Sequence, residues 1–61
     1  KADLTARERE VAALVLEGLT AKEIGKVLGI SPRTVEIYRA RLLRKYQAGS
    51  SVELVQKLAG I

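Results

Sequence analysis

Residues 20–46 read TAKEIGKVLGISPRTVEIYRARLLRKY, and this stretch decides the fold. Its first half begins with a capping box, in which the hydroxyl of Thr20 accepts a backbone N–H of the first helical turn and the carboxylate of Glu23 reaches back to the cap. Gly29 marks the end of this helix, because glycine readily takes the left-handed conformation that follows many helices. The pattern predicts a short helix that ends near residue 28.

The second half of the stretch has its own start signal. Ser31 is expected to cap a helix, and Pro32 takes the first helical position, where its missing N–H costs no hydrogen bond. This helix should run over residues 32–46. A short helix, a tight turn containing glycine and a longer basic helix form the pattern of a helix-turn-helix. Gly25 is a small residue at the point where the two helices must approach closely.

Further helices flank this pair on both sides. Thr5 and Glu8 form another capping box, and the helix that they open should end near Glu17. Ser50 and Glu53 have the spacing of a third capping box and are expected to open a last helix. Its apolar side consists of Leu54, Val55 and Leu58. The sequence therefore predicts an all-α fold, a compact four-helix domain containing a helix-turn-helix.

Length and composition exclude several classes of protein. The 61 residues suffice for one domain, so residues 1–61 are predicted to form a single domain, and a start at Lys1 without methionine indicates a piece of a longer chain. The sequence has no cysteine and no histidine, and no apolar run approaches the roughly 20 residues of a membrane span. The usual metal ligands and the usual general base are therefore missing, and Ser31 has no base to activate it. We expect no catalytic residue, no metal and no cofactor, and we predict that the chain is not an enzyme.

The positive charge is concentrated in one element. Between residues 33 and 45 the only acid is Glu36, and this stretch accounts for the whole net charge of +4, so the rest of the chain is neutral. The basic residues of the stretch are Arg33, Arg39, Arg41, Arg44 and Lys45. A neutral scaffold with one basic element is typical of a surface that binds a polyanion.

A helical wheel at about 100° per residue separates two faces of the basic helix. One face is apolar and is expected to point to the core; it carries Val35, Leu42 and Tyr46. The opposite face groups Arg33, Ile37, Ala40 and Arg44, flanked by Thr34, Glu36 and Arg41. Mixed Lys and Glu pairs would be typical of a merely solvated face, so we interpret this face as the one that binds DNA. Arg39 falls beside the core stripe.

The motifs resemble those of the LuxR-type helix-turn-helix domain. The resemblance covers about residues 4–58 and is carried by Leu4-Thr5-x-Arg7-Glu8-x-Glu10-Val11, Gly18-Leu19-Thr20-x-Lys22-Glu23-Ile24 and Leu28-Gly29-Ile30-Ser31-x-x-Thr34-Val35. The run Ser31-Pro32-Arg33-Thr34-Val35-Glu36, followed by Arg39-Ala40-Arg41, is most similar to the FixJ branch of two-component response regulators.

This resemblance implies a function and an arrangement. It implies sequence-specific binding of double-stranded DNA by the effector domain of a bacterial, cytoplasmic transcription regulator, with the third helix, residues 32–46, in the major groove. It also implies a homodimer on DNA that pairs through the last helix, and an N-terminal receiver domain that this chain does not include.

The family's contacts carry over position by position. The resemblance places Glu36, Ile37 and Ala40 at base edges, and it places Lys22, Ser31, Arg33 and Thr34 near phosphates. The basic face adds Arg41 and Arg44 to the phosphate contacts. The dimer surface is expected at Val52, Val55 and Gln56, with burial of Val55 in the core as the alternative. Tyr38 departs from the family pattern, because relatives often have histidine there.

Several interpretations stay open. A promoter-reading domain of the sigma-factor type shares a similar Arg-Glu-Arg…Gly-Leu-Thr opening, and a helical protein-interaction module could carry arginines that only keep it soluble. Glu36 also has two interpretations. It can pair with Arg33 or Arg39 three residues away, or it can accept a hydrogen bond from cytosine N4 while Ile37 packs on a thymine methyl.

Overall fold

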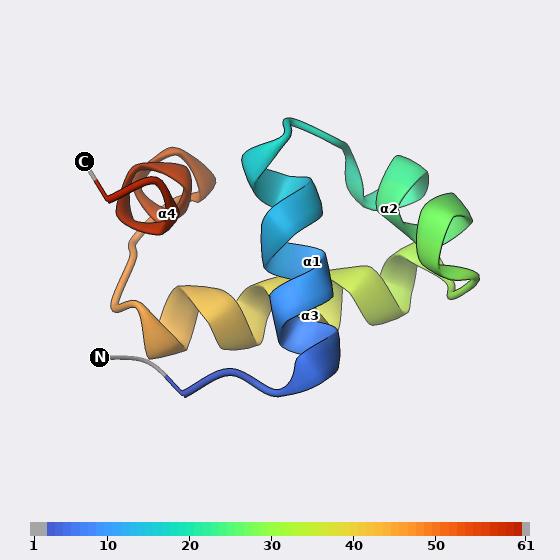
Figure 1. Cartoon of the computed structure of the whole chain (residues 1–61), viewed down its shortest axis with the longest axis horizontal. Helices are drawn as coiled ribbons and strands as arrows, with labels where there is room; N and C mark the ends of the chain where they lie inside the picture. Colours follow the sequence, from blue (N-terminus) through green and yellow to red (C-terminus); the bar gives the residue numbers. More distant parts are fainter. Residues whose placement is uncertain (1–2, 61) are drawn as a thin grey trace.

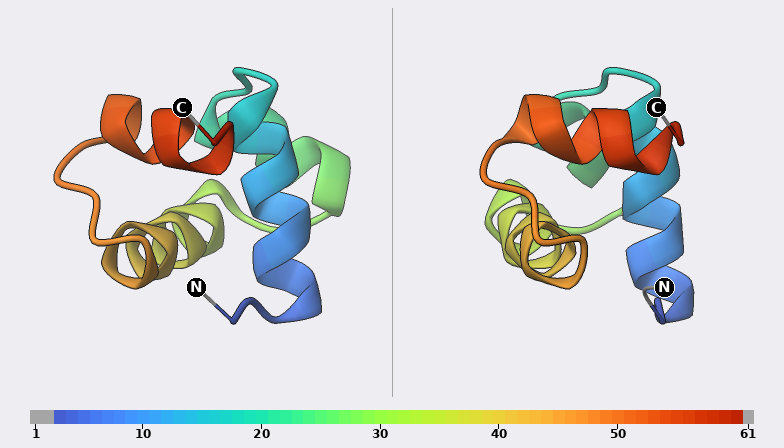
Figure 2. Two further views of the ribbon diagram at one scale, coloured as in Figure 1. Left: turned by 60° about the vertical axis from the view of Figure 1, so that its left-hand side comes forward. Right: turned by 90° about the vertical axis from the view of Figure 1, so that its left-hand side faces the viewer.

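The computed structural model describes residues 3–60, which form four α-helices. The helices are α1 (Ala6–Leu16), α2 (Ala21–Leu28), α3 (Pro32–Lys45) and α4 (Ser51–Leu58). The helix α1 crosses α3, with α2 and α4 on opposite sides of α1 (Figure 1). Two further views show α4 beside the C-terminal half of α1 (Figure 2). No helix within the described range is long and apolar enough to cross a membrane. The predicted four-helix fold with a helix-turn-helix is confirmed.

The helix starts follow the predicted caps. The Thr5 hydroxyl accepts the N–H of Glu8 at 3.2 Å, and the Glu8 carboxylate accepts the N–H of Thr5 at 2.9 Å. The same reciprocal pair joins Thr20 and Glu23 at 3.2 and 2.8 Å. Each pair satisfies two backbone donors that a helix start leaves without a partner, so both capping boxes are confirmed.

The later helices differ from expectation in small ways. The Ser50 hydroxyl accepts the N–H of Glu53 at 3.2 Å, but the Glu53 carboxylate accepts from Gly49, at 2.9 Å, instead of from the cap residue. The third helix ends at Lys45, one residue earlier than predicted, and Tyr46 serves as its C-terminal cap.

Two glycines shape the turn between α2 and α3. Gly29 has a φ of +72°, the left-handed conformation that the sequence predicted at this turn. A Cβ atom on Gly25 would lie 2.6 Å from the carbonyl oxygen of Ile30. Since real Cβ atoms do not approach backbone oxygens so closely, a side chain at residue 25 would push the turn outward. The predicted close approach at Gly25 is confirmed.

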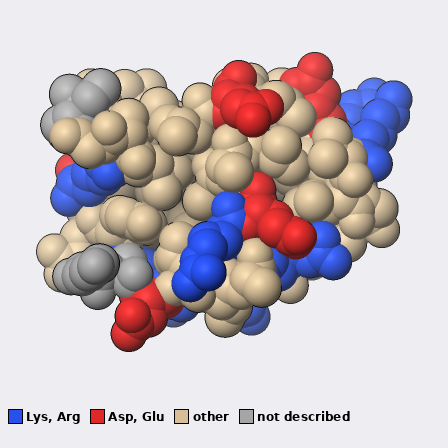
Figure 3. All heavy atoms as spheres, viewed as in Figure 1, with Lys and Arg blue, Asp and Glu red and all other residues tan. Residues whose placement is uncertain are grey.

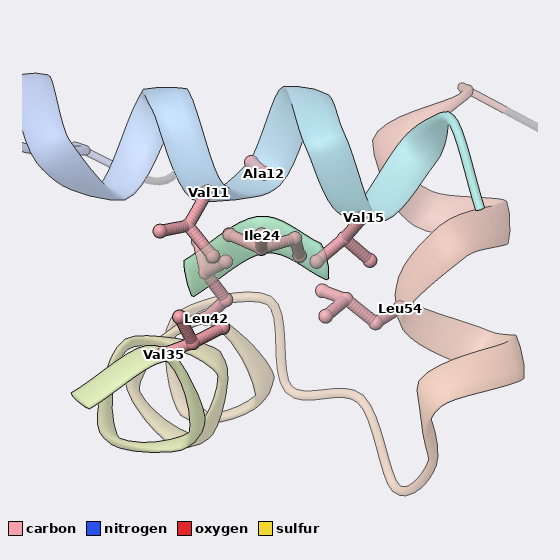
Figure 4. Close-up of a cluster of buried hydrophobic side chains, with 7 residues drawn as sticks. All are labelled: Val11, Ala12, Val15, Ile24, Val35, Leu42 and Leu54. Carbon is pink, nitrogen blue, oxygen red and sulfur yellow. The ribbon is translucent and has the colours of Figure 1, made fainter. Parts of the chain in front are cut away.

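The core draws on all four helices. The close-up shows its side chains converging between α1 and α3 (Figure 4). The buried apolar residues are Val11, Ala12, Val15, Ile24, Val35, Leu42 and Leu54. Tyr38, Tyr46 and Val55 are among the half-buried residues that pack around this cluster. The apolar side predicted for α3 therefore faces the core, which leaves its opposite side turned away from α1.

An ion pair ties the start of α1 to the end of α3. The Lys45 ammonium donates to the Glu8 carboxylate at 2.7 Å and to the carbonyl oxygen of Asp3 at 2.8 Å. Glu8 is only 2% exposed. The hydrogen bond from Lys45, followed by that from the Thr5 N–H, holds the pKa of Glu8 below its usual value. The sequence assigned Glu8 only a capping role and did not predict this pair.

Candidate nucleic-acid interface

The outward side of α3 has the composition that the wheel predicted. Val35 and Leu42 are fully buried, whereas Ile37 is 49% exposed. Ala40, about one helical turn after Ile37, is also exposed. The other exposed residues of this side are Arg33, Glu36, Arg41 and Arg44. Thr34, at the edge of the face, is half-buried. The structure thus brings the predicted base-contacting residues together on one continuous strip of a single helix.

The hydroxyl groups at the start of α3 are held in place by the cap. The Ser31 hydroxyl accepts the N–H of Thr34 at 3.1 Å, and the two side-chain oxygens lie 3.0 Å apart. Arg33 is exposed in the same first turn, and Lys22 is exposed in the first turn of α2. The positive end of the α3 dipole and these cations favour a phosphate at this end of the helix.

The basic stretch does not act as a single surface. Lys45 is directed to Glu8, so its charge is neutralised on the side of α1 and does not belong to the outward face. Arg39 pairs with Glu36 at 3.2 Å, and its side chain is only 23% exposed. The sequence had placed Arg39 beside the core stripe and assigned only Arg33, Arg41 and Arg44 of this stretch to phosphates, and the structure shows that Arg39 and Lys45 are both paired with carboxylates. Lys45 stays partly exposed, but its ammonium lies on the side of α3 that faces the start of α1.

Three arginines remain available on the outward side. Arg33, Arg41 and Arg44 form no ion pair with another residue of the described range. The guanidinium carbon of Arg41 lies 5.6 Å from the centroid of the Tyr38 ring, a cation–π distance that directs the arginine along the helix. The uncompensated positive charge of α3 is thus carried by these residues, at both ends of the strip formed by Glu36, Ile37 and Ala40.

The opposite side of the molecule has a different character. Figure 3 shows the face on which α1 lies in front of α3, and basic and acidic side chains are interspersed there. Such a face has no single sign of charge over a wide area. Since α3 turns its apolar side toward α1, its outward strip points away from α1.

The residues predicted for the dimer surface are not equivalent. Val52 is 69% exposed and Gln56 is also exposed, in the first and second turns of α4. Val55 is half-buried and packs against the core cluster. The alternative that the sequence left open, burial of Val55, therefore holds for part of its side chain, and Val52 is the more accessible apolar residue of α4.

Two contacts of basic residues in α3 were not predicted from the sequence. The Glu8–Lys45 pair joins residues 37 positions apart, and the hydrogen bond from Arg39 to Ser51, at 3.3 Å, joins residues 12 positions apart. No local spacing signals either contact. The Glu36–Arg39 pair, in contrast, is one of the two pairings that i,i+3 spacing allowed.

The four helices, the glycine turn and the exposed basic strip define the class of protein: a helix-turn-helix domain. The family model described as bacterial regulatory proteins, luxR family, matches residues 2–58, and the chain belongs to this family. The resemblance inferred from the motifs is confirmed. This family is one of regulatory proteins, and its match favours the LuxR-type interpretation over the sigma-factor type.

Known proteins similar to this chain support the assignment. The tetrathionate response regulatory protein TtrR of Salmonella typhimurium is 48% identical over 54 residues, and the transcriptional regulatory protein FixJ of Azorhizobium caulinodans is 50% identical over 62 residues. The matches cover 88% and 98% of this chain but 26% and 29% of those relatives. The chain thus spans between a quarter and a third of their length.

A solved structure matches the fold as well. It is a VqmA–ligand–DNA complex of Vibrio cholera, and the match has a TM-score of 0.87 at 47% sequence identity. It covers 93% of this chain and 25% of the chain in that structure. The arrangement of the four helices is therefore shared with a portion of a larger protein.

Proposed function

We propose that this chain is the DNA-binding unit of a bacterial transcription regulator and that α3 enters the major groove of double-stranded DNA. One observation carries the proposal. The solvent side of α3 exposes Ile37 and the small Ala40 beside Glu36, between arginines that have no ion-pair partner within residues 3–60. An aliphatic residue there matches a thymine methyl, a carboxylate matches a cytosine amino group, and a small residue permits close approach of the helix.

The cations around this strip contact the DNA phosphates. The phosphates that border the major groove are contacted by Arg33, Arg41 and Arg44. The DNA backbone next to the start of α3 is contacted by Lys22 and by the hydroxyls of Ser31 and Thr34. Contacts to phosphates supply affinity and register but carry no sequence information, so base discrimination is assigned to Glu36, Ile37 and Ala40.

The proposal extends to the longer protein from which such a domain comes. TtrR is by name a response regulatory protein, FixJ is a transcriptional regulatory protein, and the VqmA structure is a complex with DNA. By analogy, we place this domain in a cytoplasmic regulator, C-terminal to a receiver domain, and acting as a homodimer on DNA. The dimer contact is assigned to Val52 and Gln56, with a contribution from the exposed part of Val55.

Selection of bound sequences from a pool of random double-stranded DNA tests this function. The expected result is enrichment of one short motif, with affinity for that motif at least about a thousandfold above affinity for random DNA at equal salt. Absence of binding to any duplex at low salt, or binding without enrichment of a motif, would contradict the proposal. Absence of binding would leave the arginines as solubilising residues of a protein-interaction module.

A further inference from the structure

Arg39 connects the proposed base-reading residue to the fourth helix. Its Nη2 donates to Oε2 of Glu36 at 3.2 Å, and its Nη1 donates to Oγ of Ser51, the first residue of α4, at 3.3 Å. We infer that Arg39 is the positioning residue of Glu36: braced on Ser51, it holds the carboxylate in the orientation that reads a cytosine. This inference rests on the proposed function and names the residue that sets its specificity.

The geometry of the guanidinium suits this role. A guanidinium is planar and its donors have fixed directions, so two simultaneous hydrogen bonds define the place of both acceptors. Only Oε2 of Glu36 is engaged, and Oε1 has no hydrogen-bond partner among the described residues. That second oxygen is available to accept from a cytosine amino group while the first stays bound to Arg39.

Stability alone does not explain the arrangement. The Glu36 side chain is 58% exposed, and ion pairs so exposed to water contribute little to folding. The Nε atom of Arg39 is buried and has no hydrogen-bond partner within residues 3–60, which costs the folded state. The observed contacts direct both terminal nitrogens toward Glu36 and α4.

Fixing Glu36 in advance matters for recognition. A glutamate has several rotatable bonds, and immobilising such a side chain on binding opposes association. A carboxylate near phosphates is also repelled, and the adjacent guanidinium offsets this repulsion. Arg39 contributes both to holding Glu36 in place and to offsetting its repulsion from the phosphates. Only the holding of Glu36 depends on the direction of the Arg39 donors. Substitution by lysine separates them, since lysine keeps the charge without the planar pair of donors.

The experiment compares the parent domain with Arg39→Met, Arg39→Lys, Glu36→Ala and the double variant Glu36→Ala/Arg39→Met. Each is used in selection from random duplex DNA and in affinity measurements on the enriched site and on the same site with the C·G pair replaced. Thermal unfolding and far-ultraviolet circular dichroism report whether each variant folds. Ser51→Ala is included as a milder variant that removes only the brace on α4.

We expect Glu36→Ala to lower discrimination at the C·G pair by roughly fivefold to a hundredfold. Arg39→Met and Arg39→Lys should each remove most of that discrimination, and Ser51→Ala should remove a smaller part. In the Glu36→Ala background Arg39→Met should have no further effect on sequence preference, because the residue through which it acts is gone.

Three results would overturn the inference. Discrimination like that of the parent in Arg39→Lys would reduce Arg39 to a neutralising charge. A salt dependence shallower by about one unit in Arg39→Met would make it a phosphate contact. Discrimination at the C·G pair like that of the parent in Ser51→Ala would show that the hydrogen bond to Ser51 does not hold Arg39 in place. If Glu36→Ala keeps the sequence preferences of the parent, the base-reading role of Glu36 fails. If the parent itself enriches no sequence, the proposed function fails, and this result is distinguishable from the others.

Discussion

The Lys45 ammonium lies 2.7 Å from the carboxylate of Glu8, and this contact joins the last turn of α3 to the first turn of α1. The same carboxylate accepts the N–H of Thr5, while Lys45 also donates to the carbonyl oxygen of Asp3. A single ion pair therefore fixes the helix cap, the segment before α1 and the far end of α3. Its loss should loosen all three together.

We expect the free energy of unfolding to fall as the pH is lowered through the acid range. The hydrogen bond from Lys45 holds the pKa of Glu8 below its usual value in the folded state. A carboxyl of this kind stabilises the fold above its unfolded pKa, about 4.3, and the contribution is lost as the pH falls through the lower folded pKa. Urea denaturation between pH 7 and pH 2 measures it.

Glu8→Gln isolates this contribution, because the amide keeps an oxygen for the cap but loses the charge. The variant should be less stable than the parent at pH 7, and the two curves should converge in acid. Glu10→Gln is the matched control: Glu10 pairs with Arg7 at 3.2 Å on the surface, and its loss should change stability by no more than about 0.5 kcal/mol at pH 7. A Glu8→Gln variant with the parent's acid response would contradict the prediction.

The turn between α2 and α3 should be intolerant of side chains. Gly29→Val should lower stability by more than about 1 kcal/mol, because a β-branched residue is strained at a φ of +72°. Gly25→Ala should cost about 1–3 kcal/mol, since its Cβ would meet the Ile30 carbonyl oxygen at 2.6 Å. Chemical denaturation measures both changes.

Gly49→Ala serves as the control for these variants. Its φ is not positive, and the nearest atom to an added Cβ is the flexible Glu53 carboxylate at 3.4 Å. We expect no loss of stability, and a gain of up to about 1 kcal/mol from the restricted unfolded chain. Equal losses at residues 25, 29 and 49 would mean that the turn has no special requirement for glycine.

Binding to DNA should depend steeply on salt. With Lys22, Arg33, Arg41 and Arg44 on phosphates, the slope of log affinity against log salt should be near −3.6 per domain, from about −0.9 per charge. Arg33→Ala should weaken binding to the enriched site and to random DNA alike and make the slope shallower by about one unit. Gel-shift titrations at several salt concentrations measure it. Unaltered binding to both DNAs would remove Arg33 from the phosphate contacts.

Pairing through α4 should appear mainly on DNA. One short helix buries far less than the roughly 1,200–2,000 Å² of a stable interface, so the isolated domain should dimerise weakly. Val52→Asp, at a side chain that is 69% exposed, should reduce cooperative binding to a two-site operator while single-site affinity stays near that of the parent. Analytical ultracentrifugation and two-site gel shifts check this.

Val55→Asp provides the contrast, because Val55 packs partly against the core. This variant should lose cooperativity and stability together, with a lower unfolding temperature. Full cooperativity in Val52→Asp would exclude this part of α4 from the dimer contact.

The sequence by itself determined the helices and the turn. The hydroxyls of Thr5, Thr20, Ser31 and Ser50 all accept the N–H three residues onward, as their positions predicted, and Gly29 adopts the left-handed conformation. These features depend on atoms within one helical turn, whose separations follow from helix geometry alone. For the same reason the wheel placed Val35 inside and Ile37 outside. Which exposed residues touch DNA stays a prediction.

The tertiary structure decided which charges are available. The composition of the basic stretch gives five cations and names no partner for Lys45, whereas in the structure Lys45 is paired with Glu8, and Arg39 contacts both Glu36 and Ser51. It also decided that Val55 is half-buried while Val52 is exposed. These outcomes depend on how α1 crosses α3 and where α4 packs, and such placements bring together residues whose spacing in the chain carries no signal of their contact.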